Sequence, residues 1–351
     1  MLGSVVQQQM SPEKARISSK LQDAIMESWH GNSDVNVPTL VEKDKIWEEF
    51  WLYASGTHKW CPRMSAIQAL SNPDGEKFNA ETMWNFEQGH SYHDLFQQKI
   101  LPSLGSTRFL GSWQRYVKGD SCDSSGPSMF ELECAGKESM HGMEPDDNVF
   151  VEWGMSERPP LPEGEERNPW RYKEVKIRLL NERIVVKLDG VLVWDDFIEV
   201  FELKTEKESA RDSLDPRVGG KARPYHVEQV MLAMHATGIR RARIVYLFKG
   251  GMSLSGSMLE HEIFYDEEIA KELLARAKSC KEAVRRCDEF KLEEAEKSIE
   301  AEKCDDYVYD AVIDHFPRLA ECPMKSKGKA QKCSCRDICF PNGYLKKEKK
   351  K

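Results

Sequence analysis

The chain has 351 residues, of which 40% are hydrophobic and 31% are charged, and its formal net charge is −8. This composition is typical of a globular protein that buries a sizeable core. No apolar run approaches the roughly 18 residues of a membrane-spanning helix, and residues 1–20 lack the apolar stretch of a secretory signal. We therefore expect an intracellular, cytoplasmic protein without a membrane partner, built as one large domain or two small ones.

The first part of the chain has the pattern of helices. An N-terminal helical region is expected over residues 1–60, and a further helix over about 79–100, because apolar residues recur there at helical spacing. In the first region, one helical face carries Ile46, Phe50, Trp51 and Tyr53. Residues 102–170 are rich in Gly, Ser, Pro and acidic residues, so we interpret them as an irregular or partly β insertion.

From Tyr172 the pattern changes to that of strands rich in β-branched and aromatic residues. Strands are expected over 175–180, 184–189, 197–205, 243–248 and 253–265. A helix is expected over roughly 225–237, after Pro224, and a long helix over 266–303, which contains neither Pro nor Gly. This order of strands and helices predicts an α/β fold.

Two acidic residues interrupt apolar strands: Asp189 after Leu188, and Glu202 after Phe201. A buried carboxylate is costly unless it is paired or binds a metal ion. In Glu202-Leu203-Lys204, the two-residue period of a strand places both charged side chains on one face. If the strand that carries Asp189 is a neighbour, the two carboxylates repel each other, and Mg²⁺ or Mn²⁺ would relieve that repulsion. The lysine could then orient an attacking water or stabilise charge that develops on a phosphate.

A simpler interpretation of this pattern is an amphipathic hairpin with a Glu–Lys ion pair on its wet face. Glu-x-Lys occurs in many strands by chance, so this motif alone does not decide between the two interpretations.

The negative net charge does not exclude a nucleic-acid partner, because attraction for phosphate depends on local clusters within about a Debye length, ~10 Å. Basic clusters occur at Arg240, Arg241 and Arg243, at Arg217, Lys221 and Arg223, at Lys325, Lys327, Lys329 and Lys332, and in the basic tail over 341–351. Each cluster could equally be a solvated face.

The arrangement of these residues resembles the RecB-like branch of the PD-(D/E)XK nuclease superfamily, over about 61–100 and 172–339. That branch has a helix with Gly-x-x-x-His before the catalytic strands, and Gly89 and His93 match it. It also has a glutamine on the helix after the Glu-x-Lys strand, often with a histidine three positions earlier, as in His226 and Gln229. The matching residues occur in the family's order: His93, Asp189, Glu202, Lys204 and Gln229.

The resemblance implies a restriction-endonuclease-like core over 61–340, with a mixed central sheet flanked by helices. It implies a metal-dependent DNA nuclease, most simply an exonuclease acting on single-stranded DNA or DNA ends. Its partners would be DNA and proteins of recombination, repair or phage replication. The implied metal ligands for Mg²⁺ or Mn²⁺ are His93, with His90 as a competitor, Asp189 and Glu202. The catalytic set would be Asp189, Glu202, Lys204 and Gln229, and the residues lining the DNA path would be Tyr225 and His226.

The chain departs from the pattern of its relatives at three positions. Leu188 stands where the superfamily motif has proline, Val186 where many relatives have glycine, and Ala233 where many have tyrosine.

Ten cysteines in a chain without an export signal indicate metal binding more than disulfides. Some nucleases of this superfamily hold the domain together with a 4Fe–4S cluster, using one cysteine before the histidine helix and three near the C-terminus. Here the corresponding residues are Cys61, Cys322, Cys333 and Cys339, with Cys335 as an alternative to Cys333. Four thiolates also suit zinc, so the metal stays open between an iron–sulfur cluster and Zn²⁺.

Two other classes of function remain. A catalytically inactive nucleic-acid-binding protein that keeps the nuclease fold and the metal staple would bind DNA without metal-dependent cleavage. An iron–sulfur electron carrier would show a visible absorption band that bleaches on reduction, and it would not need Asp189, Glu202 and Lys204 on neighbouring strands.

Overall fold

The computed structural model describes residues 50–71, 80–105, 107–115, 148–151, 155–164, 169–249 and 258–301. Its strands are β1 (Leu52–Tyr53), β2 (Arg108–Leu110), β3 (Ser112–Arg115), β4 (Val149–Val151), β5 (Trp170–Lys173), β6 (Val175–Leu179), β7 (Ile184–Leu188), β8 (Gly190–Val193), β9 (Ile198–Lys207), β10 (Arg241–Lys249) and β11 (Met258–Phe264). Its main helices are η3 (Ala54–Lys59), α3 (Pro62–Ser71), α4 (Ala80–Leu95), the π-helical η4 (Phe96–Ile100), α6 (Arg211–Leu214), α7 (Pro224–Thr237) and α8 (Glu267–Ala301).

Two mixed sheets form the centre of the fold. The larger sheet has the order β11-β10-β9-β8-β2, and the second has the order β1-β7-β6-β4, while β3 and β5 pair separately. β9 and β10 are parallel and joined through α7, as a βαβ crossover requires, and their other neighbours in the larger sheet are antiparallel. The predicted α/β class, with mixed sheets flanked by helices, is therefore confirmed.

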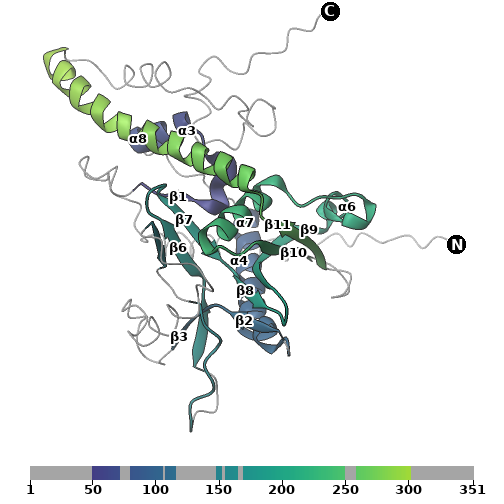
Figure 1. The fold of residues 1–351 in the computed structure, drawn as a ribbon. Coiled ribbons are helices and arrows are strands. Elements are labelled where there is room, and N and C mark those ends of the chain that lie inside the picture. Colours follow the sequence, from purple (N-terminus) through teal and green to yellow (C-terminus); the bar gives the residue numbers. More distant parts are fainter. Residues whose placement is uncertain are drawn as a thin grey trace, which may run out of the picture.

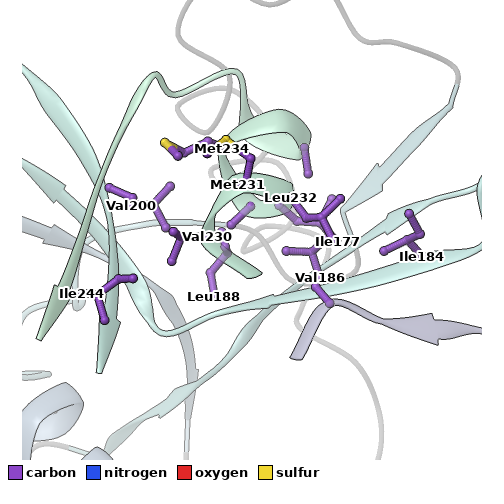
Figure 2. Packing of buried hydrophobic residues seen from close by; sticks show 14 of the residues in the cluster. Ile177, Ile184, Val186, Leu188, Val200, Val230, Met231, Leu232, Met234 and Ile244 are labelled. Atoms are coloured by element: carbon purple, nitrogen blue, oxygen red, sulfur yellow. The ribbon is translucent and has the colours of Figure 1, made fainter. Parts of the chain in front are cut away.

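Helix α7 is the centre of the apolar core. Its residues from Gln229 to Met234 are all buried, which is typical of a helix that is covered on every side. In Figure 2 its side chains lie between Val200 and Ile244 of the larger sheet and Ile177 and Val186 of the second sheet. Burying each large aliphatic side chain stabilises the fold by about 1.5–3 kcal/mol, so α7 is held firmly over the strands that carry the acidic residues.

Helix α8 covers the outside of this layer. In Figure 1 it runs across the top of the view with α3 against it and α7 below it, and both pairs of helices are in contact. Its buried residues recur every three or four positions: Ala270, Leu273, Ala277, Cys280 and Val284. The expected long helix is confirmed. None of the helices in the described ranges combines the length and the apolar character that crossing a bilayer requires.

The expected helix around Phe50, Trp51 and Tyr53 is wrong. β1 pairs in parallel with Ile184 and Val185 of β7, and the 3-10 helix η3 follows it directly. Tertiary pairing with a buried strand overrides the helical spacing of the apolar residues. The described parts of the expected insertion over 102–170 contain short strands, as predicted. The rest of the N-terminal region and of the insertion, the cysteines from Cys322 onward and the basic tail lie outside the described residues.

Candidate active site

Asp189 lies at the point where the chain passes from one sheet to the other. It is the only residue between β7 of the second sheet and β8 of the larger sheet. The next residue, Gly190, has a φ of +150°, and a Cβ atom there would lie 2.2 Å from Cε2 of Phe109. Only glycine accommodates both this positive φ and the close approach of Phe109. Gly190 therefore makes possible the change of direction that brings Asp189 against β9.

The carboxylate of Asp189 is buried, and both of its oxygens accept hydrogen bonds. Its Oδ2 accepts a hydrogen bond from the backbone N–H of Leu203 (2.8 Å), and its Oδ1 accepts one from Nε2 of Gln97 (3.1 Å). Nδ1 of His93 lies 3.2 Å from the same Oδ1. Burial acts to raise the pKa of Asp189, but His93, Lys204 and the Leu203 N–H outweigh it and leave the pKa lowered. Asp189 is therefore held as an anion directly beside the strand segment from Glu202 to Lys204.

Glu202 and Lys204 form a second cluster on the adjoining strand, bridged by Gln229. Nε2 of Gln229 donates to Oε1 of Glu202 (2.7 Å), and Nζ of Lys204 donates to Oε1 of Gln229 (2.9 Å). Nζ of Lys204 also lies 2.5 Å from Oε1 of Glu202. One amide group therefore contacts both charged residues of the Glu-x-Lys pair and fixes their relative position.

The pKa shifts of this pair follow from its burial. Burial and the nearby Asp189 raise the pKa of Glu202 to about 7, against the opposing effect of Lys204. Burial acts to lower the pKa of Lys204, but Glu202 and Asp189 outweigh it, so the pKa of Lys204 is raised. Lys204 therefore remains an ammonium ion at neutral pH. Its positive charge offsets the burial of Glu202 only in part, so the pKa of Glu202 stays raised.

The first turn of α7 is anchored so that Gln229 reaches this cluster. The hydroxyl of Tyr246 on β10 accepts a hydrogen bond from the backbone N–H of Arg223 (3.0 Å), which leaves its hydrogen for Nδ1 of His226 (2.8 Å). Burial, reinforced by Lys204, lowers the pKa of His226 to about 2, so the imidazole is neutral and accepts that hydrogen. His226 is buried and lies one helical turn before Gln229. Its side chain is directed into the protein rather than towards solvent.

Tyr225 has a different environment from its neighbour His226. Its side chain is half-buried, and its ring lies 5.2 Å from that of His58 and 4.3 Å from that of His226, measured between centroids. Tyr225 therefore keeps a partly accessible aromatic face beside the site.

The donors at this site suit a hard divalent cation in their chemistry. Asp189 and Glu202 supply buried carboxylate oxygens, the kind of ligand that Mg²⁺ and Mn²⁺ prefer. The pKa of Glu202 is raised, so a nearby cation would stabilise its carboxylate. No described residue donates a hydrogen bond to Oε2 of Glu202, which leaves this oxygen for a metal ion. In the described part of the chain, however, no three His, Cys, Asp or Glu side chains already converge as a metal-binding group. His93 is placed as a hydrogen-bond partner of Asp189, and His90 is exposed.

Two residues of the site were missed in the sequence. Gln97 donates to the carboxylate and to the backbone carbonyl of Asp189, and the hydroxyl of Tyr172 donates to that same carbonyl (2.6 Å). Gln97 follows His93 by four positions, a spacing that puts both on one face of a helix, and this was a usable signal. The chain becomes π-helical at Phe96–Ile100, a feature that often accompanies functional sites. No comparable signal marked Tyr172.

Among the candidate cluster ligands, the structure describes only Cys61. Cys61 is half-buried at the start of α3, and Cys280 of α8 is a buried free thiol near it. Burial and the proximity of Cys61 raise the pKa of Cys280 to about 12, against the hydrogen bond from Ser65. Cys280 is therefore a protonated core residue.

Comparisons with known proteins give only weak similarities. No protein-family model matches the chain, and no curated protein matches its sequence. An alkaline exonuclease, LHK-Exo from Laribacter hongkongensis, overlaps with a TM-score of 0.29 at 16% identity, over 33% of this chain and 56% of that one. The same exonuclease in complex with dAMP gives 0.30 at 14% identity, over 72% and 96%. The protein SSO0001 gives 0.32 at 12% identity, over 68% and 82%. Overlaps at this level do not assign the chain to a family.

Proposed function

We propose that the chain is a metal-dependent nuclease that hydrolyses phosphodiester bonds of DNA. The observation that carries this proposal is the hydrogen bond from the Leu203 N–H to the carboxylate of Asp189. Because Leu203 lies between Glu202 and Lys204, this bond holds two buried carboxylates and one ammonium group together. Burying such a group of charges costs stability, and phosphodiester hydrolysis is a reaction that uses all three.

The residues divide the chemistry between them. Asp189 and Glu202 would hold Mg²⁺ or Mn²⁺, which when bound supplies Lewis-acid stabilisation of the phosphate charge. Lys204 stays protonated because its pKa is raised, so it acts as a hydrogen-bond donor to a phosphate oxygen or to the attacking water. Gln229 positions the Lys204 ammonium, and His93 and Gln97 orient the carboxylate of Asp189.

The more specific part of the proposal is an exonuclease that acts on single-stranded DNA or DNA ends. It rests on the resemblance to the RecB-like branch. A second candidate is a catalytically inactive DNA-binding protein. It is favoured by the hydrogen bonds that already engage both carboxylates and by the absence, within the described residues, of a converged three-ligand metal group.

The test uses end-labelled single-stranded and double-stranded DNA with Mn²⁺ or with EDTA. Wild type, Lys204→Ala and the control Lys271→Ala are compared, the control removing the same charge from an exposed position on α8. We expect Mn²⁺-dependent digestion by wild type and the control, and a loss of roughly 100-fold or more in Lys204→Ala. Equal digestion by all three would remove the mechanism, and DNA binding without digestion would favour the second candidate.

A further inference from the structure

A pocket of about 680 Å³ lies beside the candidate active site. One part of its lining belongs to α4 and η4 and includes His90, His93 and Gln97. Another part belongs to β5, β6 and β7 and carries Lys173, Lys176 and Lys187. Because His93 and Gln97 also contact Asp189, this lysine pocket (Lys173, Lys176 and Lys187 with the α4 and η4 residues opposite) adjoins the site.

The strand register places two of these lysines directly opposite each other. Lys176 of β6 and Lys187 of β7 are paired residues in an antiparallel ladder, and both line the pocket. Like charges in opposed positions destabilise a sheet. Neither side chain contributes to the apolar core, which is formed by the alternate residues of these strands. The opposed position of the two lysines therefore costs the sheet some stability, and an anionic ligand would gain two adjacent charges.

The acidic residues of the pocket leave a positive excess. Asp94 and Glu174 also line it, and Glu174 forms an ion pair with Lys187 at 2.9 Å. Both members of that pair are about half exposed, so the interaction contributes little and exchanges readily for another anion. Lys173 is exposed and forms no ion pair within the described part of the chain.

Four arginines of the basic clusters in the central part of the sequence already form ion pairs in the fold. Arg243 and Arg241 contact the buried Glu199, at 2.7 Å and 3.3 Å. The other ion pairs join Arg243 to Glu260, Arg241 to Glu262, Arg217 to Asp215 and Arg223 to Glu206. Lys176 and Lys187, on the two strands of one hairpin, are instead placed opposite each other next to the site.

We propose that the lysine pocket holds the phosphate backbone of a nucleic-acid strand as it enters the site. This deepens the proposed function and rests on it, because it names the part of the substrate that is held and the side from which the strand approaches. Lysine contacts to phosphate are independent of base sequence and serve to position a strand. The pocket would therefore add affinity without adding sequence preference.

The test measures binding in EDTA, where no divalent ion is available for cleavage. The full-length Lys176→Gln/Lys187→Gln variant, wild type and the control Lys271→Gln/Lys278→Gln are titrated against fluorescent single-stranded and double-stranded DNA over a salt series. On single strands, each phosphate contact adds about 0.7 to the slope of log affinity against log salt. We expect the pocket variant to lose about 1.4 of that slope and about tenfold in affinity at low salt. The control should bind like wild type, and a larger loss on one DNA form identifies the preferred substrate.

A melting-temperature measurement separates binding from folding. Removing the opposed lysines should change the melting temperature little, because the repulsion that is removed offsets the loss of the exposed ion pair between Lys187 and Glu174. Equal affinity and slope in the pocket variant and the control would overturn the proposal, as would an affinity loss that accompanies a lower melting temperature.

The two proposals can fail separately. Digestion by wild type together with full DNA affinity in the pocket variant would overturn only the pocket. Weakened binding in that variant together with no digestion by wild type would support the pocket and remove the nuclease.

Discussion

The buried pair of His226 and Tyr246 makes a specific prediction about acid stability. In the folded protein the pKa of His226 is about 2, whereas an unfolded chain has a histidine pKa near 6.5. The folded pKa is the lower one, so protons bind preferentially to the unfolded state. The stability contributed by neutral His226 is fully present above about pH 6.5 and is lost progressively as the pH falls from there towards 2.

The size of this loss follows from the pKa difference. Each pKa unit corresponds to about 1.36 kcal/mol, and at about pH 5 the unfolded histidine is mostly protonated while the folded one is not. The loss at that pH is therefore about 2 kcal/mol, a large part of the usual 5–15 kcal/mol stability of a domain. His226 is almost fully buried, so solvent screening does not greatly reduce this figure.

The assay is urea unfolding of wild type and His226→Asn at about pH 7.5 and about pH 5. Asparagine keeps an acceptor for the Tyr246 hydroxyl but does not titrate, so all other ionisable groups act alike in both proteins. We expect wild type to lose about 2 kcal/mol more than the variant between the two pH values. An identical loss in both proteins would refute the assignment of His226 as a neutral acceptor.

Three further substitutions test the surroundings of the site. Gln97→Leu removes a hydrogen bond to the carboxylate of Asp189 and should lower Mn²⁺ affinity roughly 10- to 100-fold in calorimetry; unchanged affinity would exclude a positioning role. Gly190→Ala forces a Cβ atom onto Phe109 and should lower the free energy of unfolding by roughly 2 kcal/mol or more in urea; a neutral effect would contradict the strained turn. Glu199→Gln removes the buried carboxylate that Arg241 and Arg243 share, so it should lower the free energy of unfolding by roughly 3 kcal/mol. Digestion per folded molecule should stay unchanged, and lost activity at full stability would contradict a purely structural role.

Local patterns in the sequence were sufficient to predict the elements that carry the acids. Local spacing of apolar and polar residues predicts the strand before Asp189, the strand with Glu202-Leu203-Lys204 and the helix after Pro224. Their side-chain directions follow from the periods of strands and helices. The hydrogen bonds from Gln229 to Glu202 and from Lys204 to Gln229 agree with those directions.

Features that depend on pairing between distant segments could not be predicted. β1 is only Leu52–Tyr53, and it is a strand because β7 lies beside it. β8 continues from β7 after a single residue, so the sequence shows one apolar run where the fold has two strands in two sheets. The opposition of Lys176 and Lys187, in contrast, belongs to a local hairpin, because the short turn between β6 and β7 fixes their register.

The most direct test of the account is whether the buried carboxylates bind a divalent ion. Mn²⁺ is titrated into wild type and into Asp189→Asn/Glu202→Gln, with electron paramagnetic resonance reporting the free ion and circular dichroism confirming that both proteins are folded. We expect wild type to bind one ion that the folded double variant does not bind. Equal Mn²⁺ binding by the two proteins would contradict the proposed metal site.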